Sequence, residues 1–170
     1  MPDLRLVPFD RAHLPAVREW ILDPETRDLV GTRIPPSDRQ HERWYERLQD
    51  DPTRVTFVVA DGTMGQPLAA CGFTGLDHVA RGAELWLYVG DRARRGLGIG
   101  RFAVRELLAF GFQTLGLHRV SVRVFGFNST ARAFFQRCGF VDEGVDREAV
   151  FRHGRFHDVW RLAILDRELA

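Results

Sequence analysis

The sequence predicts an α/β (α+β mixed) fold in which helices cover a mixed β-sheet. Strand patterns come first along the chain, and a strand–helix–strand–helix–strands order follows, which is the order expected for such a sheet. The length of 170 residues fits one compact domain, 1–170, with its own core. Hydrophobic residues make up 45% and charged residues 28%, which is typical of globular chains and not of disordered ones.

The first part of the chain predicts a strand, two helices and a β-hairpin. Asp10 is suited to cap the first helix, and Pro24 interrupts its apolar pattern. Ser37 followed by Gln40 forms a capping box that opens the second helix. The residues expected on the buried face of the first helix are Leu14, Val17 and Ile21. The other elements, in order, are the strand Asp3–Pro8, the helix Ser37–Asp50, and the hairpin strands Arg54–Asp61 and Pro67–Leu76.

The second part predicts two strand–helix pairs and a final hairpin. A glycine-rich loop from Asp91 to Gly100 separates the first strand from its helix. Two last strands surround a turn at His153-Gly154. The elements between are the strand Glu84–Val89, a helix from about Arg101 to Leu115, the strand Arg119–Phe127 and the helix Ser129–Arg137.

The charge balance argues against a nucleic-acid partner. The 24 basic residues nearly cancel the 23 acidic ones and leave a net charge of +1, whereas phosphate backbones require a basic surplus. Every basic residue is an arginine, so a lysine-dependent phosphate loop is excluded.

Other sequence patterns predict the compartment of the protein and whether it binds a metal. No apolar run approaches the roughly 18 residues that a membrane span requires, and the opening residues lack a signal-peptide core. Cys71 and Cys138 cannot form a disulfide framework, so we expect a reducing, cytoplasmic location and no membrane partner. His153 and His157 alone make a poor metal site, and we expect no metal.

The strongest local signal is the segment Arg94–Gly100 between a strand and a helix. Its glycines allow the backbone to approach a ligand closely, and the following helix presents unpaired N–H groups and the positive end of its dipole. A diphosphate fits such a site without any lysine. An ordinary glycine turn is the alternative.

The same segment also matches a dinucleotide-binding fingerprint, Gly98-x-Gly100-x-x-Ala103. That motif should follow its strand tightly and have an acidic residue at the end of the next strand. Additional loop residues intervene here, and the strand Arg119–Phe127 contains no Asp or Glu. The sequence therefore disfavours a nicotinamide cofactor.

A second signal begins at Asn128, at a strand-to-helix junction, where an amide side chain caps a helix or binds a ligand. Ala131 and Phe135 share a helical face, and Gly139 fits the position after a helix end. Taken alone, the segment is better explained as an ordinary capped helix.

Together the two segments resemble the GNAT-superfamily N-acetyltransferases, in the branch that contains ribosomal-protein N-terminal (RimJ/RimL-like), spermidine and amino-sugar acetyltransferases. The residues are Arg95-x-x-Gly98-x-Gly100 and Asn128-x-x-Ala131-x-x-x-Phe135-x-x-x-Gly139-Phe140. The resemblance implies a mostly antiparallel sheet with a splayed parallel strand pair. It also implies an acyltransferase in which a primary amine attacks acetyl-CoA directly within a ternary complex.

The resemblance further implies which residues bind acetyl-CoA. Amide groups of Leu87, Tyr88 and Val89 would pair with pantetheine and polarise the thioester. The diphosphate would lie on the backbone of Arg94, Arg95, Gly96, Leu97, Gly98, Ile99, Gly100 and Arg101. Asn128, Phe135 and Arg137 complete the predicted cofactor contacts.

Glu84 is the candidate catalytic base, because relatives in this branch place a glutamate on the strand before the signature. An alkyl amine with a pKa near about 10.4 is protonated at pH 7, so a base must accept its proton. A structural carboxylate in a salt bridge is the alternative role. Phe135 occupies a position where the superfamily often has a tyrosine that protonates the thiolate; Tyr88, Ser129 or water are the substitutes.

The acceptor stays open at this point. A protein N-terminal amine, a polyamine and an amino sugar are all consistent with the resemblance, and the first is favoured. Asp23, Glu25 and Asp28 form an acidic group that would attract a cationic amine. A non-catalytic acyl-CoA-binding regulator is the alternative class, and a homodimer is expected by family analogy alone.

Overall fold

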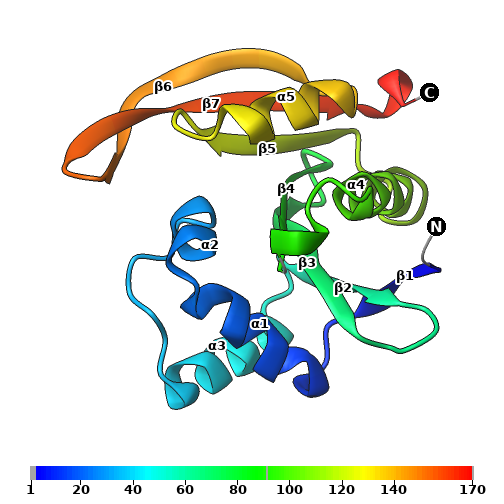
Figure 1. Ribbon diagram of the computed structural model, residues 1–170. Helices are drawn as coiled ribbons and strands as arrows, with labels where there is room; N and C mark the ends of the chain where they lie inside the picture. Colours follow the sequence, from blue (N-terminus) through cyan, green and yellow to red (C-terminus); the bar gives the residue numbers. More distant parts are fainter. Residues whose placement is uncertain (1–2, 91, 170) are drawn as a thin grey trace. The chain divides into compact units, whose positions relative to one another are not determined.

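The computed structural model describes residues 3–90 and 92–169, in which hydrogen bonds join seven strands into one mixed sheet (Figure 1). Asp91, the first residue of the predicted glycine-rich loop, lies outside the described residues. The strand order is β1-β2-β3-β4-β5-β7-β6. The pairs β1–β2, β2–β3, β5–β7 and β6–β7 are antiparallel, and β4–β5 is parallel. The predicted mixed, mostly antiparallel sheet is confirmed.

The elements have the following bounds. The strands are β1 (Leu4–Pro8), β2 (Val55–Asp61), β3 (Pro67–Asp77), β4 (Gly82–Val89), β5 (Arg119–Phe125), β6 (Val141–Arg152) and β7 (Arg155–Leu165). The α-helices are α1 (Leu14–Leu22), α2 (Pro24–Leu29), α3 (Asp38–Asp50), α4 (Ile99–Ala109) and α5 (Ser129–Arg137). Shorter helical turns are η1 (Arg11–His13), η2 (Arg92–Arg94), η3 (Phe110–Thr114) and η4 (Asp166–Glu168). None of the described helices is both long and apolar enough to cross a bilayer.

The chain forms two compact units. Unit 1 comprises Met1–Thr74 and Trp86–Leu107, and unit 2 comprises Gly75–Leu85 and Leu108–Ala170. Strands β3 and β4 and helix α4 each contribute residues to both units.

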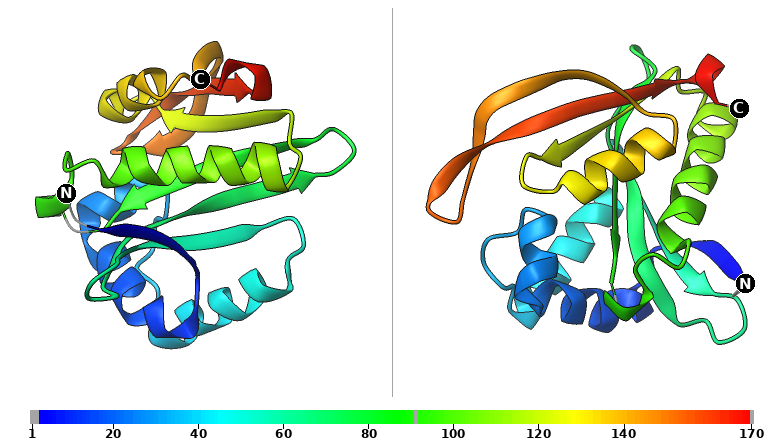
Figure 2. Two further views of the ribbon diagram at one scale, coloured as in Figure 1. Left: turned by 90° about the vertical axis from the view of Figure 1, so that its right-hand side faces the viewer. Right: turned by 45° about the horizontal axis from the view of Figure 1, so that its top comes forward.

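The core of unit 1 contains one face of α1 and the strands β2 and β3. Leu14, Val17 and Ile21, which the sequence places on one helical face, are buried and pack with Val58 and Ala70. Figure 2, in its right-hand view, shows α1–α3 and α4 on opposite sides of β3. Both faces of β3 are therefore covered, which explains its continuous apolar run.

Helix α2 was not predicted, because the sequence pattern treats Pro24 as a helix breaker. In the structure Pro24 is the first residue of α2, where its missing N–H would have no helical partner in any case. Asp23 caps this helix, since its Oδ2 accepts a hydrogen bond of 2.8 Å from the backbone N–H of Thr26. A proline after a capping aspartate starts a helix here instead of ending one.

Helix α4 begins slightly earlier than predicted and ends earlier. It starts at Ile99, and its last turn gives way to the π-helical turn η3. Strand β5 ends at Phe125, before the predicted Phe127. Both differences lie at element ends, where local sequence signals are weakest.

Unit 2 packs α5 on one face of the strands β5 and β7. Val120, Val122 and Val124 alternate along β5 and are at most 3% exposed. Arg132 on α5 lies over the ring of Trp160, 3.4 Å from the ring centroid, and donates two hydrogen bonds to the Asp142 carboxylate. The planar guanidinium thereby links the helix to both strands of the final hairpin.

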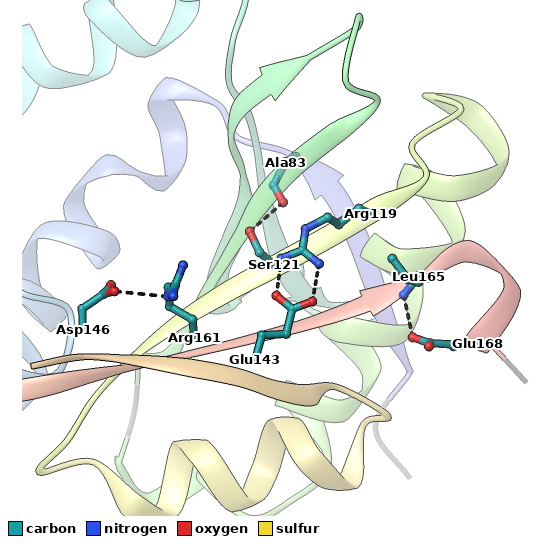
Figure 3. Close-up of polar contacts among 8 residues, drawn as sticks. All are labelled: Ala83, Arg119, Ser121, Glu143, Asp146, Arg161, Leu165 and Glu168. Atoms are coloured by element: carbon teal, nitrogen blue, oxygen red, sulfur yellow. Dashed lines mark hydrogen bonds and ion pairs between the residues drawn. The ribbon is translucent and has the colours of Figure 1, made fainter.

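The parallel pair in unit 2 is short. Its register runs from Gly82 opposite Arg119 to Glu84 opposite Ser121. Ser121 Oγ donates a 3.3 Å hydrogen bond to the carbonyl of Ala83 (Figure 3). This register fixes the place of Glu84 relative to the side chains of β5.

The close packing of Gly90 against Trp20 in unit 1 gives a stability prediction. A Cβ at Gly90 would lie 2.0 Å from two atoms of the Trp20 ring, which itself packs edge-on against Tyr88. We expect Gly90→Ala to lower the free energy of unfolding by about 1–3 kcal/mol, because the ring must leave its position. Chemical denaturation monitored by tryptophan fluorescence measures this change.

Gly82→Ala is the matched control, since its Cβ would meet only the carbonyl of Arg119 at an ordinary 3.7 Å. In a Trp20→Leu background the cost of Gly90→Ala should fall, because the clashing ring is absent. Equal costs in both backgrounds would contradict the packing argument.

Candidate active site

The glycine-rich loop of unit 1 presents open backbone at the start of α4. Gly96 and Gly98 have φ angles of +83° and +88°, in the left-handed region that side chains disfavour. A Cβ on either glycine would meet no protein atom within 4 Å. The loop therefore needs glycine for its backbone conformation and leaves the space beside it to a ligand.

The first turn of α4 adds hydrogen-bond donors to this loop. The N–H of Phe102 bonds to the carbonyl of Gly98 at 2.9 Å, so the N–H groups of Ile99, Gly100 and Arg101 have no partner within the helix. Together with the helix dipole, these groups favour an anion. The diphosphate site at this loop stays a prediction, and these N–H groups are the donors that it would use.

The side chain of Arg95 is bonded to α2. Its guanidinium donates to Glu25 Oε1 at 3.1 Å and to Thr26 Oγ1 at 2.8 Å, and Arg92 forms an ion pair with Glu25. These side-chain contacts tie the glycine-rich loop to α2, and the N–H of Arg95 is bonded to the carbonyl of Arg92 at 3.1 Å.

The same contacts bear on the expectation that Asp23, Glu25 and Asp28 attract a cationic amine. Asp23 is the cap of α2, and the N–H of Thr26 is the main cause that lowers the pKa of its carboxyl. Glu25 is shared by two arginines. Asp23 and Glu25, which were expected to attract a cationic amine, therefore have structural partners within unit 1.

The end of β4 in unit 1 carries Leu87, Tyr88 and Val89, all half-buried. Tyr88 belongs to the surroundings of the core and has its ring 6.1 Å from those of Trp20 and Trp86. Burial raises the pKa of its phenol, so the hydroxyl stays protonated. Burial likewise raises the pKa of Cys71 to about 12, which leaves this free thiol neutral.

Glu84 lies on β4 in unit 2 and is half-buried. Loss of water around it raises the pKa of its carboxyl, and the positive charge of Arg123 partly offsets this rise. A carboxylate with a raised pKa is a stronger base than an ordinary one. The candidate base therefore has the electrostatic environment that general-base chemistry favours.

The remaining predicted contacts are on or next to α5. Asn128 is the cap of α5 and accepts a 3.1 Å hydrogen bond from the N–H of Ala131. Phe135 is buried against Phe134 and Phe140, so its ring is part of the core of unit 2. Arg137 is exposed in the last turn of the helix. Asn128 and Phe135 thus have structural roles whether or not they touch a cofactor.

The structure groups the predicted residues by unit. The loop residues and the end of β4 lie together in unit 1, and Glu84, Asn128, Phe135 and Arg137 lie in unit 2. Within residues 3–90 and 92–169, no three His, Cys, Asp or Glu side chains are grouped as metal ligands.

Sequence reasoning missed Arg123, the cation that acts on Glu84. The alternation in Arg119–Phe125 could have indicated it, because every second residue is valine. The residues between the valines, Arg123 among them, therefore face away from the core.

The family model of the acetyltransferase (GNAT) domain matches residues 3–141. Spermidine N(1)-acetyltransferase of Vibrio cholerae is 29% identical over 128 residues, covering 75% of this chain and 72% of the relative. A Bacillus subtilis protein provisionally named a ribosomal N-acetyltransferase is 34% identical over 156 residues, covering 88% and 78%.

The solved structures lead to the same family. The spermidine N-acetyltransferase of Vibrio cholerae, crystallised with CoA and spermine, superimposes with a TM-score of 0.89 at 25% identity, covering 97% of this chain and 96% of that one. A dodecameric structure of the same enzyme has a TM-score of 0.82 at 25% identity, covering 96% and 94%. This chain belongs to the GNAT family and is an acetyl-CoA-dependent acyltransferase.

Proposed function

We propose that this protein transfers acetyl from acetyl-CoA to the N-terminal amine of a protein or peptide, by direct attack of the amine in a ternary complex. The observation that carries the proposal is Glu84, a half-buried carboxylate whose pKa is raised by burial. In this role Glu84 accepts the proton that the amine loses as it attacks, directly or through one water.

The residues proposed to bind acetyl-CoA are chosen by the hydrogen-bonding and charged groups that they present. Acetyl-CoA supplies the activated acetyl thioester. The backbone from Arg94 to Arg101 holds its diphosphate, and the amides of Leu87, Tyr88 and Val89 hold the pantetheine. Asn128, Phe135 and Arg137 are further proposed contacts. The open space beside Gly96 and Gly98 supports this assignment.

An N-terminal α-amine suits this base better than an alkyl amine does. The ordinary pKa of an α-amine is about 7.7–8.0, against about 10.4 for a lysine-like amine, so far more of it is neutral at pH 7. The occupation of Asp23 and Glu25 by structural partners removes part of the attraction for a polycation. Both points support a peptide acceptor, and polyamines and amino sugars are the alternatives.

No protein acid is assigned to the departing thiolate. The Phe135 ring has no proton to donate, and a thiol with an ordinary pKa near about 8.5 is an acceptable leaving group without one. Tyr88, Ser129 and water are the candidates to protonate the thiolate in this proposal.

A panel of amines tests the proposal. Thiol release from acetyl-CoA is followed with peptides, spermidine and amino sugars, and acetyl-CoA affinity is measured in parallel by calorimetry. We expect turnover with peptides to exceed turnover with the other amines. Tight acetyl-CoA binding without turnover on any amine would instead support an acyl-CoA-binding regulator.

A further inference from the structure

One face of the β5–β7–β6 sheet in unit 2 carries a cluster of charged side chains. In β5 the valines at 120, 122 and 124 are buried, while Arg119, Ser121 and Arg123 point to the opposite face. In the register with β7, Arg123 lies directly opposite Arg161, so these two guanidinium groups share that face. This second face therefore carries three arginines, Arg119, Arg123 and Arg161.

Two of its three arginines are neutralised within the protein. Arg119 makes a two-pronged contact with the Glu143 carboxylate, and Arg161 Nε lies 3.2 Å from Asp146 Oδ1 (Figure 3). Arg123 is exposed, and no carboxylate of residues 3–90 or 92–169 lies within ion-pair distance of it.

This arrangement has an electrostatic cost that a ligand would relieve. Like charges directly opposite on neighbouring strands destabilise a sheet. Asp146 balances only one member of the Arg123–Arg161 pair. The Glu84 carboxylate acts on Arg123 without forming an ion pair with it, so an anion bound directly to the Arg123 guanidinium would balance its charge more closely.

Arg123 is also close to the candidate base. Glu84 lies opposite Ser121, and Arg123 is two residues further along β5 on the same face. Neighbouring strands are about 4.8 Å apart, and alternate residues of one strand are about 6.7 Å apart. The Cα atoms of Glu84 and Arg123 are therefore about 8 Å from each other. One small acceptor molecule can therefore place its amine at Glu84 and its carboxylate at Arg123.

We propose that Arg123 binds a carboxylate of the acceptor, and that the acceptor is an amine with a carboxylate a few bonds away, such as the N-terminus of an acidic peptide. This inference rests on the proposed function and names its substrate class. The guanidinium donates paired hydrogen bonds to the carboxylate, which orients the amine toward Glu84. A polyamine, in contrast, would place its further positive charges beside Arg123.

Matched acceptors test this inference. Short peptides that differ only by glutamate or glutamine at the first or second position are compared for kcat/KM with thiol release. Free amino acids, whose own carboxylate adjoins the amine, form a second arm, and spermidine forms a third. We expect the acidic peptides to be preferred about tenfold or more, which is typical of a hydrogen bond between charged groups.

Two variants test whether Arg123 causes the preference for acidic peptides. Arg123→Gln should lower the ratio of kcat/KM between the glutamate and the glutamine peptides to about one. The loss of its charge also raises the pKa of Glu84, which changes kcat/KM for both peptides alike and leaves this ratio unaffected. Arg155→Gln makes the same charge change at an exposed position of β7 and should retain the preference. In the wild type the preference should weaken as salt screens the exposed guanidinium.

The outcomes separate the two proposals. An unchanged preference in Arg123→Gln, an equal loss for all acceptors, or spermidine as the best acceptor would overturn the role of Arg123. If no amine is turned over, the proposed function fails. The inference is then decided by peptide affinity in the presence of CoA: tighter binding of the acidic peptides that Arg123→Gln abolishes supports it, and equal affinities refute it.

Discussion

A Glu84→Gln variant is expected to lose roughly a hundredfold in kcat/KM at pH 7, because a positioned general base contributes about that much or more. Its affinity for acetyl-CoA should stay at the wild-type value, since the predicted cofactor contacts lie elsewhere in the chain. Glutamine keeps the size and polarity of the side chain but cannot accept the proton. Steady-state thiol release and calorimetric titration with acetyl-CoA measure the two quantities.

The pH profile adds an independent check on Glu84. Burial raises the pKa of this carboxyl, so it becomes protonated at a higher pH than an exposed glutamate does. Below that pKa the base is lost, and kcat/KM of the wild type should fall as the pH decreases. Protonation of the acceptor amine lowers kcat/KM of both enzymes in the same way, so the Gln variant should lack only the additional fall that protonation of Glu84 causes in the wild type.

Glu148→Gln is the matched control, because Glu148 is an exposed glutamate of β6 outside the proposed site. It should retain wild-type activity and the wild-type profile. A Glu84→Gln enzyme with an unchanged rate would remove Glu84 as the base and leave it as a structural carboxylate.

Features set by residues close in sequence could be predicted. The capping box of α3 forms as its spacing indicates: Ser37 Oγ accepts from the N–H of Gln40, and Gln40 Oε1 accepts from the N–H of Ser37. The left-handed glycines before α4 follow from the same kind of signal, because a strand-to-helix connection with a ligand-accessible backbone requires them. In these cases the interacting groups are near neighbours in the chain.

Features that depend on distant residues could not be predicted. Arg95 is part of the recognised signature, yet its side chain bonds to Glu25 and Thr26, about seventy residues earlier. The exposed charge of Arg123 is likewise invisible until the register with β7 shows that Asp146 balances Arg161 and not Arg123. Ion-pair partners are a property of the tertiary fold, and no spacing rule encodes them.

The glycine-rich loop gives the second large expected effect. Gly98→Val should weaken CoA binding about a hundredfold, since hydrogen bonds between N–H groups and a charged ligand contribute about 1.5–3 kcal/mol each and the side chain would block more than one. The φ of +88° adds backbone strain of about 1–2 kcal/mol in the folded state. Calorimetric titration with CoA and thermal unfolding measure the two effects separately.

Gly65→Val distinguishes ligand blocking from strain. Gly65 has a φ of +66° and no protein atom within 4 Å of its Cβ position, but it lies in the β2–β3 turn of the same unit. Both variants should therefore lose similar stability, while only Gly98→Val should lose CoA affinity. Because backbone strain is matched, a selective loss at Gly98 would assign the diphosphate to this loop. Wild-type CoA affinity in Gly98→Val, or an equal loss in both variants, would place the diphosphate elsewhere.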